Sequence, residues 1–80
     1  MPRYHINLYN DLELFDEEGS NFPDLTAAVA AAQRSGRDLI AEHVTLGLPI
    51  DLSHRMEVAD DAGAVVSVLY FRDLVTIKRG

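Results

Sequence analysis

The longest periodic stretch of the chain, residues 24–46, predicts an amphipathic helix. At about 100° per residue, one face of this helix collects small and apolar side chains, and we expect that face to be buried. Its members are Ala28, Val29, Ala32, Gly36, Leu39, Ile40, His43 and Leu46. Asp24 suits the N-cap, Gly47 suits a left-handed C-terminal position, and Pro49 prevents continuation. Because glycine inside a helix costs about 1 kcal/mol relative to alanine, Gly36 predicts the close approach of a second backbone, most simply that of a sheet.

Alternation of apolar and polar positions predicts half-buried strands at residues 3–9 and 55–59. Two acidic segments, residues 16–19 and 60–63, each end in glycine, which is typical of a turn whose last residue is left-handed. The first segment predicts a tight reversal before the helix. The second predicts a hairpin whose return arm begins at residue 64.

That return arm, residues 64–71, is apolar on both faces apart from Ser67, which predicts a central strand covered on both sides. One helix covers only one face of a sheet. The other face would then be closed by residues 74–77, with residues 75–78 as a candidate last strand, or by a second copy of the chain. These elements predict an α+β fold for residues 1–80: a single ββαββ-type domain with an antiparallel sheet and one long helix across one face.

The composition of the chain limits the kinds of molecule it is expected to bind. Thirteen acidic residues against seven basic ones give a net charge of −6, which disfavours direct binding to nucleic acid and favours a basic protein partner. No apolar run is long enough for a signal peptide or a membrane span, so we expect no membrane association and a cytoplasmic location. Because 80 residues bury only a thin core, we also expect a homodimer.

The exposed side of the predicted sheet is the main candidate for a partner surface, since it mixes polar, aromatic and charged side chains. An ordinary solvated sheet face would account for the same mixture. The two-sided apolar strand nevertheless favours association, most simply as a symmetric dimer. The candidate surface consists of Arg3, His5, Asn7, Tyr9, Arg55, Glu57, Ser67 and Leu69.

Two sets of side chains are candidate metal sites. Five carboxylates between Asp11 and Glu18 could hold Ca²⁺, but their spacing is not that of an EF-hand loop, and their composition favours a solvated acidic turn. Three histidines, His5, His43 and His54, could converge on Zn²⁺, but none of their spacings is that of a metal motif. His43 lies in the apolar stripe near the helix end, where it is a structural ring or a pH-responsive or ligand-binding group.

Nothing in the sequence indicates catalysis. Ser53 and His54 are adjacent on an extended segment, where neighbouring side chains point to opposite faces and cannot easily hydrogen-bond. The chain lacks a nucleophile elbow, a phosphate loop, a dinucleotide fingerprint and cysteine. We therefore expect no enzyme activity and no cofactor.

Short motifs along most of the chain resemble a bacterial family of short proteins of unknown function. They are Met-Pro-Arg-Tyr (1–4), Asp-Glu-Glu-Gly (16–19), Pro-Asp-Leu-Thr-Ala-Ala (23–28), Glu-Val-Ala-Asp-Asp-Ala-Gly-Ala-Val-Val (57–66) and Phe-Arg-Asp (71–73). The resemblance implies a compact cytoplasmic α/β domain and supplies no activity or catalytic residue.

A second similarity is to antitoxins of the HicB type, through Phe-Pro-Asp-Leu (22–25) and Gly-Leu-Pro-Ile (47–50). The chain departs from that pattern, since the usual loop after Pro-Asp-Leu and a separate DNA-binding tail are missing. The leading hypothesis is a small non-enzymatic interaction or regulatory domain that forms a homodimer. The alternatives are a HicB-like antitoxin that neutralises a basic toxin, and a small-molecule or metal-binding protein that uses the His43 region.

Overall fold

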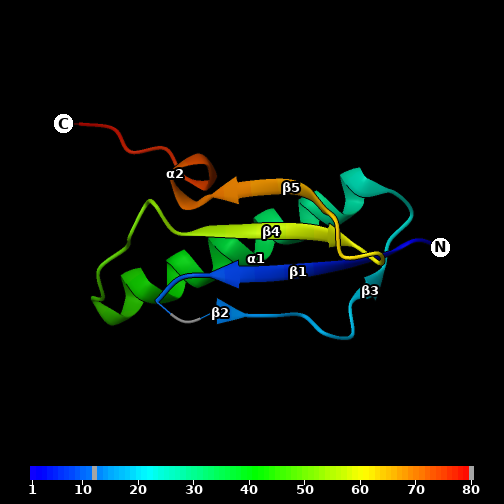
Figure 1. The fold of residues 1–80 in the computed structure, drawn as a ribbon. Coiled ribbons are helices and arrows are strands. Elements are labelled where there is room, and N and C mark those ends of the chain that lie inside the picture. The colour runs from blue at the N-terminus through cyan, green and yellow to red at the C-terminus, as the bar shows by residue number, and fades with distance from the viewer. Residues whose placement is uncertain (12, 80) are drawn as a thin grey trace.

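The computed structural model describes residues 1–11 and 13–79. Figure 1 shows one antiparallel sheet with a long helix running across its back. The elements are β1 (Arg3–Tyr9), β2 (Glu13–Leu14), β3 (Ser20–Asn21), α1 (Leu25–Leu46), β4 (Arg55–Asp60), β5 (Val65–Tyr70) and α2 (Phe71–Leu74). The strand order is β2-β1-β4-β5, and β3 pairs with β1 beyond β2. The predicted α+β fold is confirmed.

The predicted helix boundaries are confirmed by the caps of α1. The Asp24 carboxylate accepts a hydrogen bond of 2.8 Å from the backbone N–H of Ala27, which satisfies a donor in the first turn. At the other end Gly47 has φ of +70°, and the N–H groups of Gly47 and Leu48 donate to carbonyls of the last turn. In the described residues, no helix is long and apolar enough to cross a membrane.

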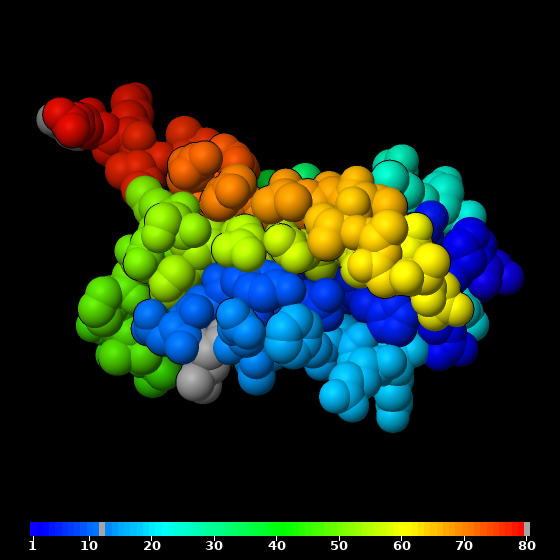
Figure 2. Space-filling model, in the orientation of Figure 1, coloured from blue at the N-terminus to red at the C-terminus, as the bar shows by residue number. Residues whose placement is uncertain are grey.

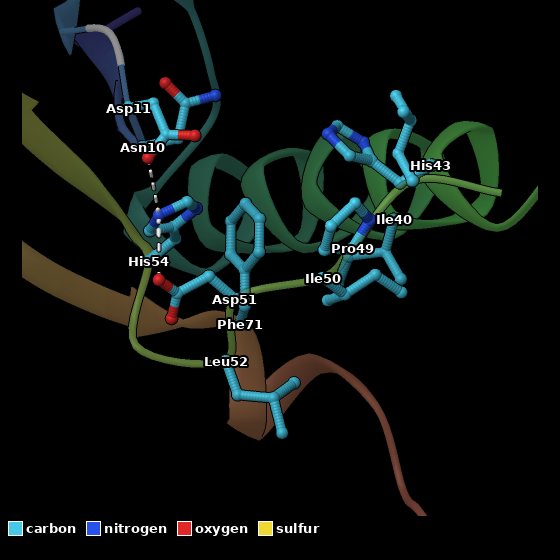
Figure 3. A pocket seen from close by; sticks show the side chains of 11 residues that line it. Asn10, Asp11, Ile40, His43, Pro49, Ile50, Asp51, Leu52, His54 and Phe71 are labelled. Carbon is cyan, nitrogen blue, oxygen red and sulfur yellow. Dashed lines mark ion pairs between the residues drawn. The ribbon is translucent and has the colours of Figure 1, made fainter. Parts of the chain in front are cut away.

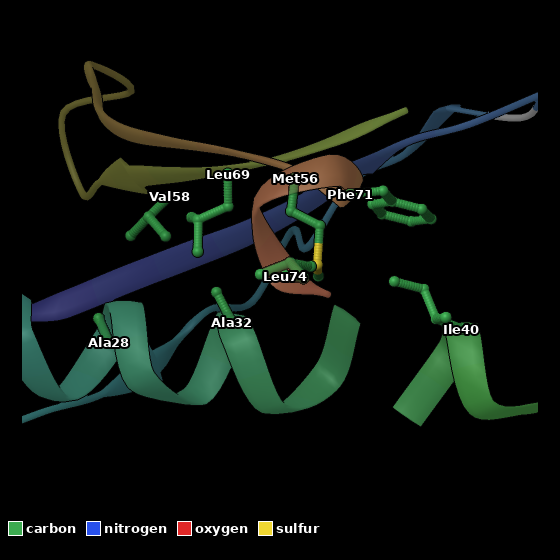
Figure 4. Close-up of a cluster of buried hydrophobic side chains, with 8 residues drawn as sticks. All are labelled: Ala28, Ala32, Ile40, Met56, Val58, Leu69, Phe71 and Leu74. Atoms are coloured by element: carbon green, nitrogen blue, oxygen red, sulfur yellow. The ribbon is translucent and has the colours of Figure 1, made fainter. Parts of the chain in front are cut away.

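The core lies between α1 and the sheet, as Figure 4 shows. Small residues on α1 allow the helix to lie close to β4 and β5. The buried apolar side chains of this cluster are Ala28, Ala32, Ile40, Met56, Val58, Leu69, Phe71 and Leu74. Leu46, predicted to be buried, is 64% exposed, because the last turns of α1 extend beyond the strands (Figure 1).

Gly36 is approached by side chains and not, as predicted, by a second backbone. A Cβ atom placed on Gly36 would lie 2.4 Å from Cδ1 of Leu74 and 3.0 Å from Sδ of Met56. Arg37 holds Leu74 in place, since its Nε donates a 2.9 Å hydrogen bond to the Leu74 carbonyl. Leu74 of α2 therefore occupies the space that a side chain at position 36 would need.

The first reversal differs from a simple hairpin. β2 and β3 each contain two residues, and both pair with β1 rather than with each other. Gly19 adopts φ of +71°, as the turn chemistry predicted. The Asp16 carboxylate fixes this turn by accepting hydrogen bonds from the N–H groups of Gly19 and Ile6. Within the stretch from Asp11 to Glu18 that was considered for Ca²⁺, Leu12 lies outside the described residues.

The second hairpin is confirmed, but the position of its return arm is a correction. β5 was predicted to be a central strand, whereas within the described residues it pairs with β4 alone and forms an edge of the sheet. Residues 75–79 contain no strand, against the prediction for residues 75–78. The physical reason is that α2 turns the chain toward α1, so that Leu74 enters the core on the helix side.

We predict that Gly36→Ala destabilises the protein. The added methyl group gains about 1 kcal/mol of helix propensity but forces Leu74 to move, and overpacking of this kind typically costs about 1–3 kcal/mol. In a Leu74→Val background, which removes the clashing Cδ1 atom, the same substitution should become neutral or stabilising. Urea denaturation of the four proteins measures both effects. An equal cost of Gly36→Ala in both backgrounds would contradict this packing.

Candidate functional site

The face of the sheet opposite α1 carries three rows of side chains across β1, β4 and β5. Figure 2 shows this face of the molecule. In strand register the rows are Tyr9–Arg55–Tyr70, Asn7–Glu57–Val68 and His5–Ala59–Val65. Six of the eight predicted surface residues alternate onto this face, and they are Arg3, His5, Asn7, Tyr9, Arg55 and Glu57.

Contacts between side chains fix the middle of this face. The Arg55 guanidinium lies 4.3 Å from the centre of the Tyr9 ring, and its Nε donates a 3.1 Å hydrogen bond to Glu57. The Tyr9 ring in turn meets Phe15 edge-on. Desolvation, together with the nearby Glu57 carboxylate, raises the pKa of the Tyr9 phenol. These side chains form a preorganised surface rather than a set of independently solvated groups.

Ser67 and Leu69, the other two predicted surface residues, lie on the helix side of the sheet. Ser67 is opposite Val58, and Leu69 is opposite Met56 and only 7% exposed. The prediction of Leu69 as a surface residue is therefore wrong. A strand that is apolar on both faces carries no alternation from which its orientation can be deduced, and pairing with β4 decides it.

Sequence reasoning missed the valines that β5 exposes. Val65, Val66 and Val68 are 50%, 40% and 45% exposed. A register shift between Val58 and Ala59 leaves Val66 opposite no residue of β4, as in a β-bulge. Exposed apolar side chains on an edge strand are uncommon, because such an edge is a ready template for pairing with another chain. The signal in the sequence was the two-sided apolar run itself.

His5 connects this face to both acidic turns. Its Nδ1 lies 2.6 Å from the carbonyl oxygen of Asp16, and its Nε2 lies 3.1 Å from a carboxylate oxygen of Asp61. Both partners are acceptors, so both ring nitrogens donate only when the ring is an imidazolium. The hydrogen bond to Asp61, followed by that to Asp16, raises the pKa of His5 above its ordinary value of 6.5.

A second candidate site is a hollow of about 760 Å³ at the C-terminal end of α1. Figure 3 shows His43 and His54 on its two sides, with Phe71 between them. Nδ1 of His43 donates a 2.8 Å hydrogen bond to the Leu39 carbonyl. Nε2 of His54 lies 3.3 Å from Asp51 and 3.6 Å from Asp11.

The three histidines that were considered as a candidate zinc site do not converge, because His5 lies on the outer face of the sheet whereas His43 and His54 line the hollow. Among the described residues, no group of three His, Cys, Asp or Glu side chains is arranged to hold a metal ion. In the acidic stretch from Asp11 to Glu18, Asp16 is engaged in its turn. The Ser53 hydroxyl donates to Asp51, so it does not form a pair with His54.

We predict that His5 titrates above pH 6.5 and that its protonated form stabilises the fold. Because the folded pKa is raised, this stabilisation is fully present below the unfolded value of 6.5 and is lost as the pH rises through the folded pKa. The difference in unfolding free energy between the native chain and His5→Gln should shrink over that range. Titration of the His5 ring by NMR measures the pKa directly. A midpoint at or below 6.5 would refute the two-acceptor arrangement.

Comparison with known proteins identifies a family but no function. A family model described as a domain of unknown function, DUF6894, matches residues 3–72. The search of curated proteins gave no match. The search of solved structures gave none either. The matched range covers all the strands and α1, and it ends inside α2. The chain therefore belongs to the DUF6894 family, whose members share a domain of unknown function.

Proposed function

We propose that the protein is a small, non-enzymatic interaction domain that works as a homodimer, in which the β5 strands of two copies pair side by side in antiparallel orientation. The observation that carries this proposal is the open edge of β5 with its three exposed valines. Pairing two such edges satisfies unpaired backbone groups and removes apolar side chains from water.

The chemistry of β5 favours a second copy over an unrelated strand. Residues 65–70 contain no charged side chain, so antiparallel pairing of β5 with itself brings no like charges into opposition. Charges of opposite sign flank the strand, because Arg72, with Asp73 beside it, follows the strand whereas Asp60 and Asp61 precede it. In an antiparallel pair, Arg72 of each copy comes toward the acidic turn of the other.

Arg72 is suited to this contact by its position. It is exposed, and its guanidinium lies 4.4 Å from the centre of the Tyr70 ring, which is part of the outer face. Asp61 is also exposed, with 69% of its side chain accessible. Two-fold symmetry would make this contact twice, once at each end of the shared seam.

A paired sheet would be twice as wide and would present the preorganised Tyr9, Arg55 and Glu57 surface once on each half. The net charge of −6 favours a basic protein as the further partner of this surface. A HicB-type antitoxin role would be one form of such binding. It stays a prediction from sequence similarity.

We predict a reversible dimer with a dissociation constant on the order of micromolar, since a single short strand gives a small interface. Sedimentation velocity over a range of concentrations measures it. Val68→Lys places a charge on the outer face beside the seam and should weaken association by about tenfold or more. The matched control is Val44→Lys, an equally large change at a residue of α1 that is 64% exposed. A monomer at all concentrations, or equal weakening by both variants, would refute the proposal.

We further predict that Arg72→Glu weakens the dimer about twofold to fivefold at low ionic strength, because it replaces attraction to the acidic turn with repulsion. The effect should diminish in high salt, whereas that of Val68→Lys should persist. Arg34→Glu on the exposed face of α1 provides the control for the change in net charge. If Arg34→Glu and Arg72→Glu act alike, the proposed antiparallel arrangement is wrong.

A further inference from the structure

We propose that the hollow at the C-terminal end of α1 is a binding site for an organic cation with an apolar body, such as an alkyl or aryl amine. This inference rests on the residues of the hollow and does not depend on dimerisation. The hollow has the size of ordinary small-molecule sites, which span about 300–1,000 Å³.

The inner wall of the hollow is apolar and rigid. Ile40 and Phe71 line it and belong to the buried core, at 6% and 4% exposure. Ile50 packs against the same core, while Leu48 is 49% exposed at the rim. Figure 3 shows Pro49, Ile50 and Ile40 grouped beneath His43. Such a wall suits a hydrocarbon chain or ring, because burying apolar surface away from water is favourable.

The ionisable groups of the hollow are two carboxylates and two histidine rings, and His54 lies against both carboxylates. Asp11 and Asp51 line it, and no Lys or Arg is among the described residues that do. Hydrogen bonds from the side chain and the backbone N–H of Ser53 lower the pKa of Asp51, so this carboxylate is ionised at neutral pH. The C-terminal end of α1, which carries the negative pole of the helix, lies at the same place. A cation is stabilised there, whereas an anion is repelled.

The two histidines support the same assignment. Because Nδ1 of His43 donates to the Leu39 carbonyl, the neutral ring presents Nε2 as an acceptor, which is the group an ammonium N–H requires. His54 has different partners. Its Nε2 faces two carboxylates and its ring stands edge-on to Phe71 at 5.8 Å, so it holds the loop that carries Asp51 against the apolar wall.

A matched ligand series tests the charge requirement. Hexylamine, hexanol and hexanoate share one hydrocarbon chain and differ in the charge of the head group. We expect hexylamine to shift the backbone amide NMR signals of residues 40–54 and to bind at least about tenfold more tightly than hexanol, and hexanoate to bind least well. Equal binding of hexanol and hexylamine, preferential binding of hexanoate, or shifts confined to residues away from the hollow would overturn the proposal.

A pair of isosteric variants locates the cation. Asp51→Asn removes one charge but still accepts the Ser53 N–H bond that shapes the loop, so its fold should be retained, as the amide spectrum will show. It should weaken hexylamine binding about threefold to tenfold and leave hexanol binding unchanged. Asp38→Asn makes the same charge change on the exposed face of α1 and should leave both unchanged. Equal weakening by the two variants would assign the effect to net charge alone and overturn the site.

Discussion

The structure depends on one constraint: a single long helix covers one face of a five-stranded sheet and leaves the other face in water. The seam of small residues on α1 allows the helix to approach closely, and Met56, Val58 and Leu69 fill the space above it. Ala28 and Ala32 are fully buried. Because so few residues carry this core, α2 contributes out of proportion to its four residues, placing both Phe71 and Leu74 in it.

The same constraint explains the contrast between the two sides of the sheet. The covered side is made of apolar side chains, whereas the open side is held by an arginine–tyrosine stack, a carboxylate partner and the His5 ring between two acceptors. These polar contacts order the open face without a second layer. At β5, however, polar contacts give way to valine. Side-chain contacts thus order the open face over β1 and β4, whereas β5 exposes apolar side chains.

Local chemistry could be predicted from the sequence, and relations between distant segments could not. The helix caps could be predicted from Asp24 and Gly47, and the two turns from Gly19 and Gly63, because each of these effects acts within a few residues. The helix stripe and the alternation in β1 and β4 gave the correct core face. The orientation of β5 could not be predicted, since Leu69 and Val68 are both apolar and only pairing with β4 distinguishes them.

The edge position of β5 and the turn into α2 depend on the contact between Leu74 and Gly36, two residues far apart in sequence. The hollow is likewise formed by α1, the loop that follows it and α2. From the sequence, His43 alone indicated a site in this region.

The two edges of the sheet differ in a way that limits assembly. One edge is the continuous strand β5, whereas the other is divided into β2 and β3, two residues each, separated by an acidic turn. A segment of two residues offers too few backbone groups to recruit a further chain. If two copies join along β5, as proposed, both outer edges of the combined sheet would consist of the short strands β2 and β3. Growth would then stop at a closed pair, and the same short outer strands would protect the molecule against fibre formation.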